Sequence, residues 1–351
     1  MNEDVKIILE AGGTAPSGDN SQPWNFAVSG DTVEIYNVPK RDLSLYNYQN
    51  HACFIAHGAL LENMEITAND LGYSCDISIF PDPQKPDLVS RVRFIPGQKK
   101  PQPLKTAIQN RATNRKPYQT IPLTETEKNA ILSSADHINS GRIILTGEKD
   151  DIHKLAGAVS VNERLLFENK TMHDFFFSQI RWTDQEEQEK RNGLFLKTLE
   201  LKPPQRASFN LFKHWGALNF LKFLKISHTV AKDNAKNYAA SAAIGAVTMA
   251  GNSPQDYVNG GRIFERLWLT AAGLGLSLQP ITGLVFLAHR IFQEDGPQFN
   301  HSQKELIKQS FSEITKALKS GDLTIIMMFR IGKSEGPSAR SSRLPLEKLL
   351  I

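Results

Sequence analysis

The segment Thr14–Phe26, TAPSGDNSQPWNF, determines how the rest of the chain is interpreted. Its two prolines restrict the backbone and Gly18 relaxes it, so the segment predicts a turn of defined shape. Short polar side chains within it supply hydrogen-bonding groups. The apolar run Val5–Leu9 precedes the segment, and Trp24 and Phe26 follow it, which indicates a loop between a helix and a core strand. We expect this loop to bind a ligand; a capped turn without a ligand is the alternative.

The segment resembles the A-P-S-x-x-N-x-Q-P-W-x-F motif of the nitroreductase family of flavoenzymes. In that family the loop lies against FMN that is bound mainly by the other subunit. The resemblance therefore implies that the loop contacts FMN here. The matching cofactor-binding residues are Pro16, Ser17, Gly18, Asn20 and Gln22.

Length and composition limit the class of protein. The chain has 351 residues, 40% of them hydrophobic, which is enough for one large core or two ordinary ones. A net charge of +4, spread along the chain, does not predict nucleic-acid binding. Cys53 and Cys75 are the only cysteines, so a disulfide framework and a cysteine-rich zinc site are excluded. We expect a soluble, cytoplasmic protein without a signal peptide or stable membrane association.

The chain contains an internal repeat. Gly58–Ser74 aligns without gaps on Gly261–Ser277, at a shift of 203 residues. Apolar residues recur on one helical face in each copy, so each copy predicts a buried amphipathic helix that ends at a Leu-Gly pair. A strand is expected before each helix, at Thr32–Val38 and Ala243–Ala250. Chance similarity between two core helices is the alternative. The identical pairs are Gly58/Gly261, Glu62/Glu265, Thr67/Thr270, Ala68/Ala271, Leu71/Leu274, Gly72/Gly275 and Ser74/Ser277.

The repeat predicts two copies of one α+β unit. Residues 1-100 form the first half, residues 105-150 and 240-351 the second, and residues 151-240 a helical lid insertion. The first half keeps the Thr14–Phe26 loop. The second half has Arg111–Tyr118, Pro280–Gly283 and Ser341–Pro345, which resemble three further elements of the nitroreductase family.

The resemblance implies an α+β, FMN-dependent nitroreductase fold that is internally duplicated. Mixed, mostly antiparallel sheets would be flanked by helices. Two halves that lack complementary elements would form one FMN site in a single-chain pseudo-dimer, as in the Acg-type branch of the family. Arg181–Thr183, Asn192–Leu194 and Ala339–Arg343 agree with that branch.

The phosphate of FMN needs cations with planar, multi-donor groups. Arg111, Arg115, Arg340 and Arg343 are the candidates, with Thr113 beside the first two. A solvated surface charge is the alternative for any single arginine. Arg111 and Arg343 together occupy positions that match the family motifs, and this favours a role in phosphate binding.

The flavin ring needs flat packing and hydrogen bonds along its polar edge. The resemblance implies that Pro280, Thr282 and Gly283 lie at the ring and that the backbone N–H near Thr282 points at flavin N5. The family often has Glu at the position of Thr282. Pro16, Ser17 and Asn20 suit the edge of the ring, whereas the remaining contacts at the pyrimidine edge stay unassigned.

Flavin carries the hydride chemistry, so neither a catalytic side chain nor a metal is assigned. The resemblance implies an FMN-binding oxidoreductase that uses NADH or NADPH to reduce a small acceptor, such as a nitroaromatic or quinone, by a ping-pong mechanism. The alternatives are an FMN-sequestering protein with little or no turnover and an interaction protein with an inactive fold. The sequence predicts a monomeric pseudo-dimer or a homodimer, and it does not identify the physiological acceptor.

The insertion is helical in pattern and rich in aromatic residues. Phe212, Trp215, Phe220 and Phe223 have spacings compatible with one helix face, and lysines such as Lys222 are interspersed among them. Three interpretations stay open. The segment forms a lid over the flavin, packs against another protomer, or contacts a membrane surface as a basic amphipathic segment.

Overall fold

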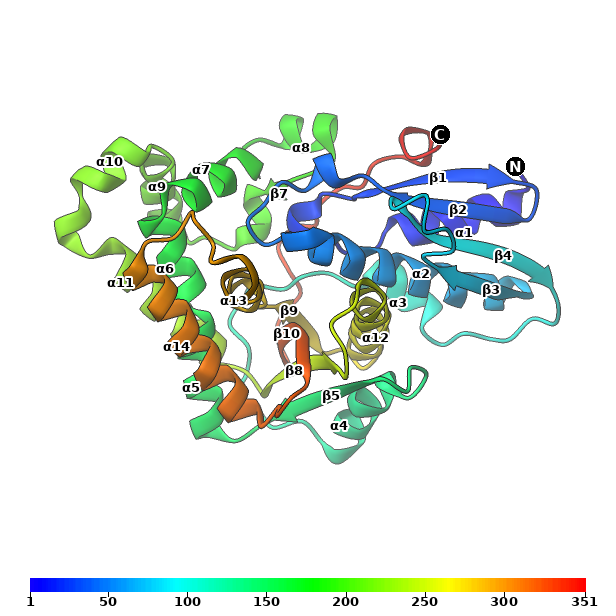
Figure 1. The fold of residues 1–351 in the computed structure, drawn as a ribbon. Coiled ribbons are helices and arrows are strands. Elements are labelled where there is room, and N and C mark those ends of the chain that lie inside the picture. The colour runs from blue at the N-terminus through cyan, green and yellow to red at the C-terminus, as the bar shows by residue number, and fades with distance from the viewer.

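The computed structural model describes the backbone of residues 1–351 and every side chain except that of Lys222, which lies outside the described residues. The chain forms two α+β units joined by two long central helices, with further helices packed at one end (Figure 1). The first unit contains α1 Glu3–Gly13, β1 Trp24–Ser29, β2 Thr32–Asn37, α2 His51–Leu71, β3 Tyr73–Ile79 and β4 Leu88–Pro96.

The second unit follows the short helix α3, Lys105–Asn110. Its four strands and four helices come from both sides of the insertion in the sequence. They are α4 Glu125–Leu132, β5 Gly141–Thr146, β8 Ala243–Met249, α12 Pro254–Gly273, β9 Ser277–Pro280, α13 Gly283–Glu294, α14 His301–Leu318 and β10 Thr324–Gly332.

The insertion, residues 151–240, is mostly helical. It contains most of α5 Lys149–Val159, then α6 Val161–Glu168, α7 Lys170–Gln179, β6 Ile180–Arg181, α8 Asp184–Lys190, β7 Leu194–Phe195, α9 Pro203–Phe212, α10 Trp215–Phe220 and α11 Ile226–Ala239. These helices lie on the left and at the top in Figure 1. α5, α6 and α11 share an apolar core with α13 and α14.

The two sheets have the same topology. Their strand orders are β1-β2-β4-β3 and β5-β8-β10-β9, and every neighbouring pair is antiparallel. Counted in chain order within each unit, both orders are first-second-fourth-third. The predicted strands at 32–38 and 243–250 are confirmed as β2 and β8. No mixed pairing occurs within either four-stranded sheet, so the predicted mixed character is wrong for these sheets.

Local signals explain the ends of the helices. Thr124 and Glu127 form a reciprocal capping box at the start of α4. α2 ends at Leu71, and Gly72 follows with a φ of 99°, a left-handed conformation that favours glycine. The predicted Leu-Gly helix end is therefore confirmed in the first unit. α12 ends at Gly273, just before the second Leu-Gly pair.

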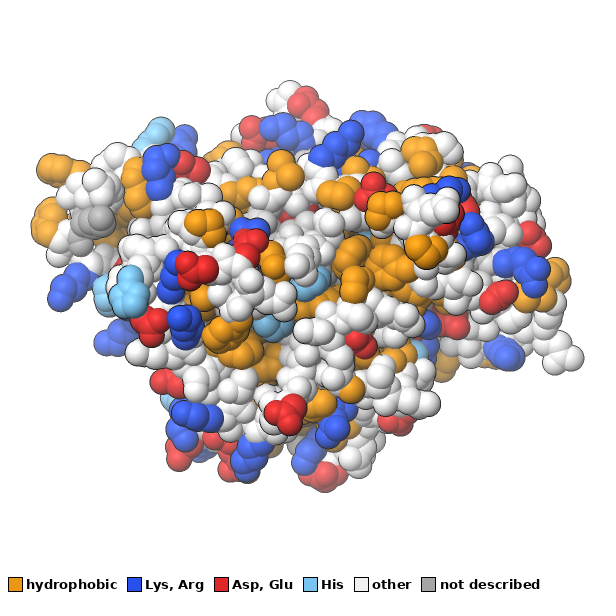
Figure 2. Space-filling model, viewed as in Figure 1, with side chains coloured by type: hydrophobic (Ala, Val, Ile, Leu, Met, Phe, Trp, Pro, Cys, Tyr) orange, Lys and Arg blue, Asp and Glu red, His pale blue; other side chains and the backbone are white. Residues whose placement is uncertain are grey.

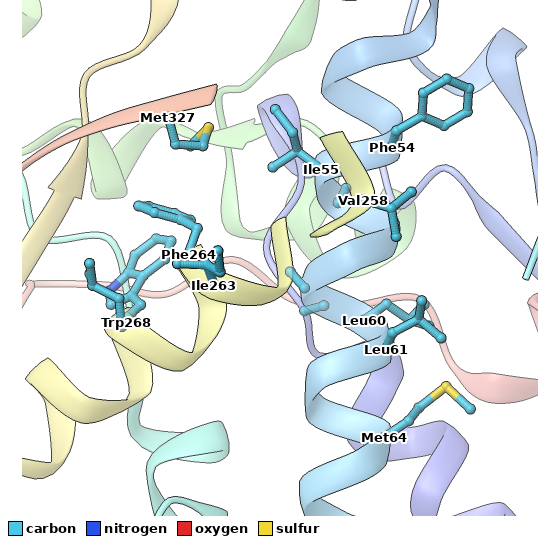
Figure 3. Close-up of a cluster of buried hydrophobic side chains, with 14 of the residues drawn as sticks. Phe54, Ile55, Leu60, Leu61, Met64, Val258, Ile263, Phe264, Trp268 and Met327 are labelled. Carbon is cyan, nitrogen blue, oxygen red and sulfur yellow. The ribbon is translucent and has the colours of Figure 1, made fainter. Parts of the chain in front are cut away.

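The two long helices cross with their backbones in contact. A Cβ on Gly58 of α2 would overlap the carbonyl oxygen of Val258, and a Cβ on Gly261 of α12 would overlap that of Ile55. Figure 3 shows apolar side chains of both helices around this crossing. Sixteen of the 21 residues of α2 and 11 of the 20 residues of α12 are buried, so the crossing lies in the interior of the molecule.

Each unit also receives a segment that runs beside its sheet from a distant part of the chain. The C-terminal tail pairs with the edge strand β1, where the Phe26 N–H donates to Leu349 O at 2.7 Å and the Ile351 N–H donates to Phe26 O at 2.9 Å. In the second unit, Thr113 forms a parallel bridge with Leu278 of β9. These pairings bring residues 111–118 and the C-terminal tail close to the loop at 14–26.

The aromatic stretch of the insertion does not form one helix face, so that prediction is wrong. α9 begins at the Pro203-Pro204 pair, because proline is tolerated in a first helical turn, and it ends at Phe212. α10 then starts at Trp215 in a new direction. Phe220 and Phe223 are 78% and 72% exposed.

The surface carries charges of both signs. On the face in Figure 2, Lys and Arg side chains alternate with Asp and Glu and form no large patch of one sign. Among the described residues, no helix is both long and apolar enough to cross a membrane.

Candidate functional site

A cavity of about 520 Å³ lies between the two units. Both long helices border it, together with the loop after α1, the segment before α4, the start of α13 and the C-terminal tail. The predicted cofactor residues meet here, with the exception of Gln22. Those that line the cavity are Pro16, Ser17, Gly18, Asn20, Arg111, Thr113, Arg115, Pro280, Thr282, Gly283, Arg340 and Arg343.

The loop has its left-handed residues at positions that the sequence did not indicate. Asp19, Asn20 and Gln22 have φ values of 47°, 55° and 49°, whereas Gly18 is not in the left-handed region. The prediction that Gly18 relaxes the backbone is therefore wrong. A Cβ at Gly18 would make a tight contact of 3.2 Å with Asp42 Oδ2. Left-handed non-glycine residues concentrate at functional loops, where packing enforces them.

Two amides of the loop have different roles. The Asn20 amide nitrogen donates to Ser342 O at 3.0 Å, while its buried Oδ1 has no hydrogen-bond partner among the described residues. Gln22 is fully buried behind the loop, where Nε2 donates to Arg191 O at 2.8 Å and Oε1 accepts from the Leu344 N–H at 2.7 Å. Asn20 therefore offers a free acceptor to the cavity. Gln22 ties the loop to the insertion and the C-terminal tail.

The insertion forms a tight turn beside this loop. The Arg181 guanidinium donates to Asn192 O and Asn192 Oδ1, both at 2.8 Å. Gly193 has a φ of 78°, and a Cβ there would overlap the Arg181 guanidinium and Gln179 O. The two sequence patterns at 181–183 and 192–194 thus build one turn that presents the Arg191 carbonyl to Gln22.

Arg111 is buried at one end of the cavity. Its Nη2 donates to Thr14 O at 2.7 Å, and its Nε lies 3.0 Å from Glu265 Oε1 in an ion pair. The guanidinium also lies over the Trp268 ring at 4.8 Å. Burial raises the pKa of Glu265, while the adjacent Arg111 opposes that rise. α12 thereby supplies both the carboxylate and the aromatic ring that position Arg111.

Arg343 and Arg340 differ in how their donors are used. The Arg343 Nη1 donates to the carbonyls of Ser341 and Ser342, and its buried Nε has no partner among the described residues. Burial and the neighbouring Arg111 charge lower the pKa of Arg343 to about 10. Arg340 is exposed, and it donates to Gln109 O and Asn110 O, both at 2.6 Å. The Arg111–Arg343 pair is consequently the stronger anion site.

The start of α13 presents free backbone donors to the cavity. The Thr282 hydroxyl does not cap the helix, because it donates to Met328 O at 3.1 Å and accepts from the Met328 N–H at 2.9 Å. Among the described residues, the Thr282 N–H has no hydrogen-bond acceptor. A helix N-terminus with unpaired N–H groups attracts negative charge and acceptor atoms.

One part of the cavity wall, between the two long helices, is apolar, whereas Asp19, Asp42 and Ser44 line another part. Figure 3 shows Ile55 on α2 opposite Phe264 and Trp268 on α12, with Met327 of β10 beside them. These four residues line the cavity, as do small alanines on the same face of α2. Together with the Pro280 turn, they make a flat apolar slot with polar groups at its edges.

A second cavity, of about 1040 Å³, opens from the first and lies under the insertion. The residues common to both linings are Asp19, Tyr46, Arg115, Leu194, Pro280, Thr282 and Gly283. Arg115 lies at this junction, where its Nη1 donates to Thr198 O at 3.0 Å and burial lowers the pKa of its guanidinium.

Sequence reasoning missed a polar row in the second cavity. Tyr46 donates to Asn162 Oδ1 at 2.9 Å, Asn162 Nδ2 donates to Glu163 Oε1 at 3.3 Å, and Tyr238 donates to the same oxygen at 3.0 Å. Burial raises the pKa of Glu163 to about 7. Burial and the nearby Asp42 likewise raise the pKa of Asp19 to about 7. Asp19 lies in the Thr14–Phe26 segment, but no motif marked Tyr46, Asn162, Glu163 or Tyr238, which come from the insertion and from a separate loop.

Sequence relatives are found mainly in Mycobacterium tuberculosis. An uncharacterised protein is 23% identical over 349 residues, which cover 96% of this chain and 47% of that protein. A "Putative NAD(P)H nitroreductase" is 26% identical over 124 residues, covering 34% of this chain and 36% of that protein. Another, named acg, is 25% identical over 93 residues, covering 26% and 28%. The chain thus matches less than half the length of these curated relatives.

Solved structures of similar fold have low identity to this chain. The FMN-dependent nitroreductase NfnB from Mycobacterium smegmatis, in complex with NADPH, is 12% identical, with a TM-score of 0.42 over 70% of this chain and 96% of that one. A nitroreductase with bound FMN from Bacteroides fragilis is 10% identical, with a TM-score of 0.38 over 71% and 97%. No protein-family model matches the chain. The relatives named as putative nitroreductases are similar to this chain over 26–34% of its length, and the motifs that meet in the cavity resemble those of the nitroreductase family.

Proposed function

We propose that this protein is an FMN-dependent oxidoreductase that uses NADH or NADPH to reduce a small acceptor such as a nitroaromatic or a quinone. The observation that carries the proposal is the single cavity in which the Thr14–Phe26 loop of one unit meets Arg111, Arg343 and the Pro280–Gly283 turn of the other. Bound FMN would supply hydride transfer at its N5 position, and the protein would supply binding, orientation and access.

The arginine pair fits the phosphate of FMN. Burial and the charge of Arg111 lower the pKa of Arg343, and Glu265 and Glu187 compensate part of the charge of the pair. A bound dianion would neutralise the pair and supply an acceptor for the free Arg343 Nε. Arg340 would contribute less, since it is exposed and both of its Nη groups already donate to backbone carbonyls. Arg115 lies at the junction with the second cavity.

The slot between the long helices fits a flavin ring. The side that the two long helices form is apolar, and the free Asn20 Oδ1 and Thr282 N–H also border the cavity. An isoalloxazine offers both N–H donors and acceptor atoms along one edge, so these two groups complement it. Pro16, Ser17, Gly18, Thr113, Pro280 and Gly283 would complete the binding site, whereas Gln22 would act only by shaping the loop.

We also infer that the chain is an internally duplicated pseudo-dimer with halves at 1-100 and at 105-150 plus 240-351. Equal strand orders in the two sheets support the duplication. The equivalent glycines of the repeat give further support. Gly58 contacts Val258, which is three residues before Gly261, and Gly261 contacts Ile55, which is three residues before Gly58. Each half would contribute the elements that the other has lost, so one chain would bind one FMN.

Residues 151-240 would act as a lid over this site. Leu194 and Thr198 of this segment line the first cavity, and several of its helices enclose the second. These contacts favour a lid over the two alternatives, a protomer interface and a membrane-contacting segment. The same enclosure supports a second candidate function, sequestration of FMN with little or no turnover.

An anaerobic titration separates the two candidate functions. The purified protein is expected to be yellow, to bleach within seconds on addition of NADH or NADPH, and to regain its colour with a quinone or nitroaromatic. Bleaching by dithionite but by neither nicotinamide would favour sequestration. Protein that stays colourless after incubation with FMN would exclude both candidate functions.

A further inference from the structure

We propose that the second cavity, under helices α6, α7, α9 and α11, binds the electron acceptor as an apolar aromatic molecule, and that Glu163 donates a hydrogen bond to an oxygen atom of that molecule. The inference rests on the proposed function, because the acceptor must reach a flavin in the neighbouring cavity. It adds the place where the acceptor binds and a residue that contacts it.

The size and lining of the second cavity favour an apolar ligand. Its volume of about 1040 Å³ is at the upper end of the range for small-molecule sites. Leucines and phenylalanines of α6, α7 and α9 form one apolar part of the wall, and charged and polar residues line the rest. The apolar residues that line it include Leu166, Phe167, Met172, Phe175, Phe176, Phe209, Phe212, Ile226 and Val230.

The cavity meets the flavin slot at the start of α13. Pro280, Thr282 and Gly283 line both cavities, so a ligand in the second cavity can reach the face of the first without leaving the protein. A Cβ on Gly283 would lie 2.6 Å from Asn162 Oδ1, which places α6 directly against this junction. The polar row on α6 therefore faces the junction, while the phenylalanines lie farther into the insertion.

Glu163 has one oxygen that its neighbours leave free. Its Oε1 accepts from both Tyr238 and Asn162, whereas its buried Oε2 has no partner among the described residues. Tyr46 accounts for the orientation of Asn162, because it donates to Asn162 Oδ1. An acidic proton is consequently expected on Oε2, where it can be donated to a carbonyl or nitro oxygen.

The protonation state of Glu163 depends on a small set of neighbours. Burial raises its pKa to about 7, and the hydrogen bonds from Asn162 and Tyr238 oppose that rise. Burial also raises the pKa values of Tyr46 and Tyr238, so both phenols stay neutral near pH 7. The charges of Arg330 and Arg115 act on Tyr238, and the charge of Asp19 acts on Tyr46. Asp19 is therefore the other group whose titration must be separated from that of Glu163.

Calorimetric titration of the FMN-loaded, oxidised protein with 2-methyl-1,4-naphthoquinone tests the proposal. The protonation state of Glu163 sets the direction of the pH dependence of quinone binding. Below its pKa, Glu163 donates a hydrogen bond to the quinone oxygen, and above its pKa the carboxylate repels that oxygen. Binding should weaken about tenfold between about pH 6 and about pH 8.5. Glu163→Gln retains a donor and cannot ionise, so its dissociation constant should be independent of pH. Asp19→Asn should keep the pH dependence of the unsubstituted protein.

A second variant tests the location of the site without relying on titration. Val230→Trp on α11 would fill the cavity and should weaken naphthoquinone binding by about tenfold or more. Lys232→Trp places the same side chain at an exposed position on the same helix, and it should bind the quinone normally. Equal binding by both variants, or a pH dependence that persists in Glu163→Gln, would overturn the proposal.

The FMN absorbance spectrum of each variant separates this inference from the proposed function. Protein that binds no FMN would contradict the proposed function. Protein that binds FMN but takes up naphthoquinone independently of Val230 and Glu163 would contradict only the acceptor cavity. Displacement of the quinone by NADPH alone, with no effect of either variant on quinone binding, would assign the cavity to the nicotinamide and overturn the inference.

Discussion

Gly58 of α2 and Gly261 of α12 are reciprocal partners at the crossing of the two central helices. A Cβ on Gly58 would overlap the carbonyl of Val258, three residues before Gly261, and a Cβ on Gly261 would overlap the carbonyl of Ile55, three residues before Gly58. Such reciprocity is typical of a contact across a two-fold axis, where residue i meets j and j meets i. Here both partners belong to one chain.

Gly58→Ala should destabilise the protein strongly. The added methyl group meets backbone atoms that cannot rotate away, so the helices must separate along much of their length. We expect the free energy of unfolding to fall by about 1–3 kcal/mol or more, measured by urea denaturation. Gly157→Ala in α5 is the control, because its methyl group would be in open space and should stabilise the helix by about 0.5–1 kcal/mol. Similar losses in both variants would contradict the crossing geometry.

Arg343→Ala should weaken FMN binding. The variant removes the free Nε donor and half of the cationic pair, and the dissociation constant of FMN should rise by about tenfold to a hundredfold. Quenching of FMN fluorescence measures this change. Arg142→Ala, which removes an exposed arginine on β5, should leave FMN affinity unaltered. An unchanged affinity in Arg343→Ala would refute the phosphate assignment.

Arg111→Ala has two consequences that a second substitution separates. It removes a phosphate ligand, and it also leaves Glu265 buried without its ion-pair partner, which typically costs about 3–5 kcal/mol of stability. The double variant Arg111→Ala/Glu265→Gln should recover much of the stability in thermal denaturation but none of the FMN affinity. Recovery of both properties would mean that Arg111 acts only as a structural partner of Glu265.

Glu62 should make the protein sensitive to acid. Burial alone would raise its pKa, but a hydrogen bond from His137 and the charges of Arg262 and Arg266 lower it to about 2. A depressed pKa contributes stability above the ordinary value of 4.5, and this contribution is lost as the pH falls from there toward about 2. Glu62→Gln should therefore have a lower stability at neutral pH and a shallower decline in acid, measured by circular dichroism.

The Glu62 cluster also indicates how many cofactors one chain binds. Glu62 and Glu265 are equivalent in the internal repeat, and Glu265 pairs with Arg111 at the proposed phosphate site. At the equivalent position, Glu62 pairs instead with Arg262, Arg266 and His137, all from the second unit. In the proposed pseudo-dimer, these side chains would occupy the position of a second phosphate ligand. One site per chain is the expected result.

The sequence predicted the parts of the site that carry strong local signals. The Gly58–Ser74 repeat located both central helices, because a glycine at a helix crossing and a Leu-Gly helix end are specified by a few neighbouring residues. The motif positions located Arg111 and Arg343 at one cavity for a similar reason. The motif predicts Gln22 in the lining of the cavity, but a motif does not specify the direction of a side chain, and Gln22 lies behind the loop.

The second cavity could not be predicted in this way. Glu163, Tyr238 and Tyr46 lie far apart in the chain, and only the packing of the insertion brings them together. Their ordinary sequence surroundings contain no periodicity or turn signal. The left-handed backbone of Asp19 also depends on tertiary contacts, since residues of its type adopt many conformations.

The number of FMN molecules bound per chain tests the central claim most directly. Apoprotein is titrated with FMN, and the equivalence point is read from the quenching of flavin fluorescence against the protein concentration. Two complementary halves that build one site predict an equivalence point of one FMN per chain. An equivalence point of two, or no saturable binding, would contradict the account.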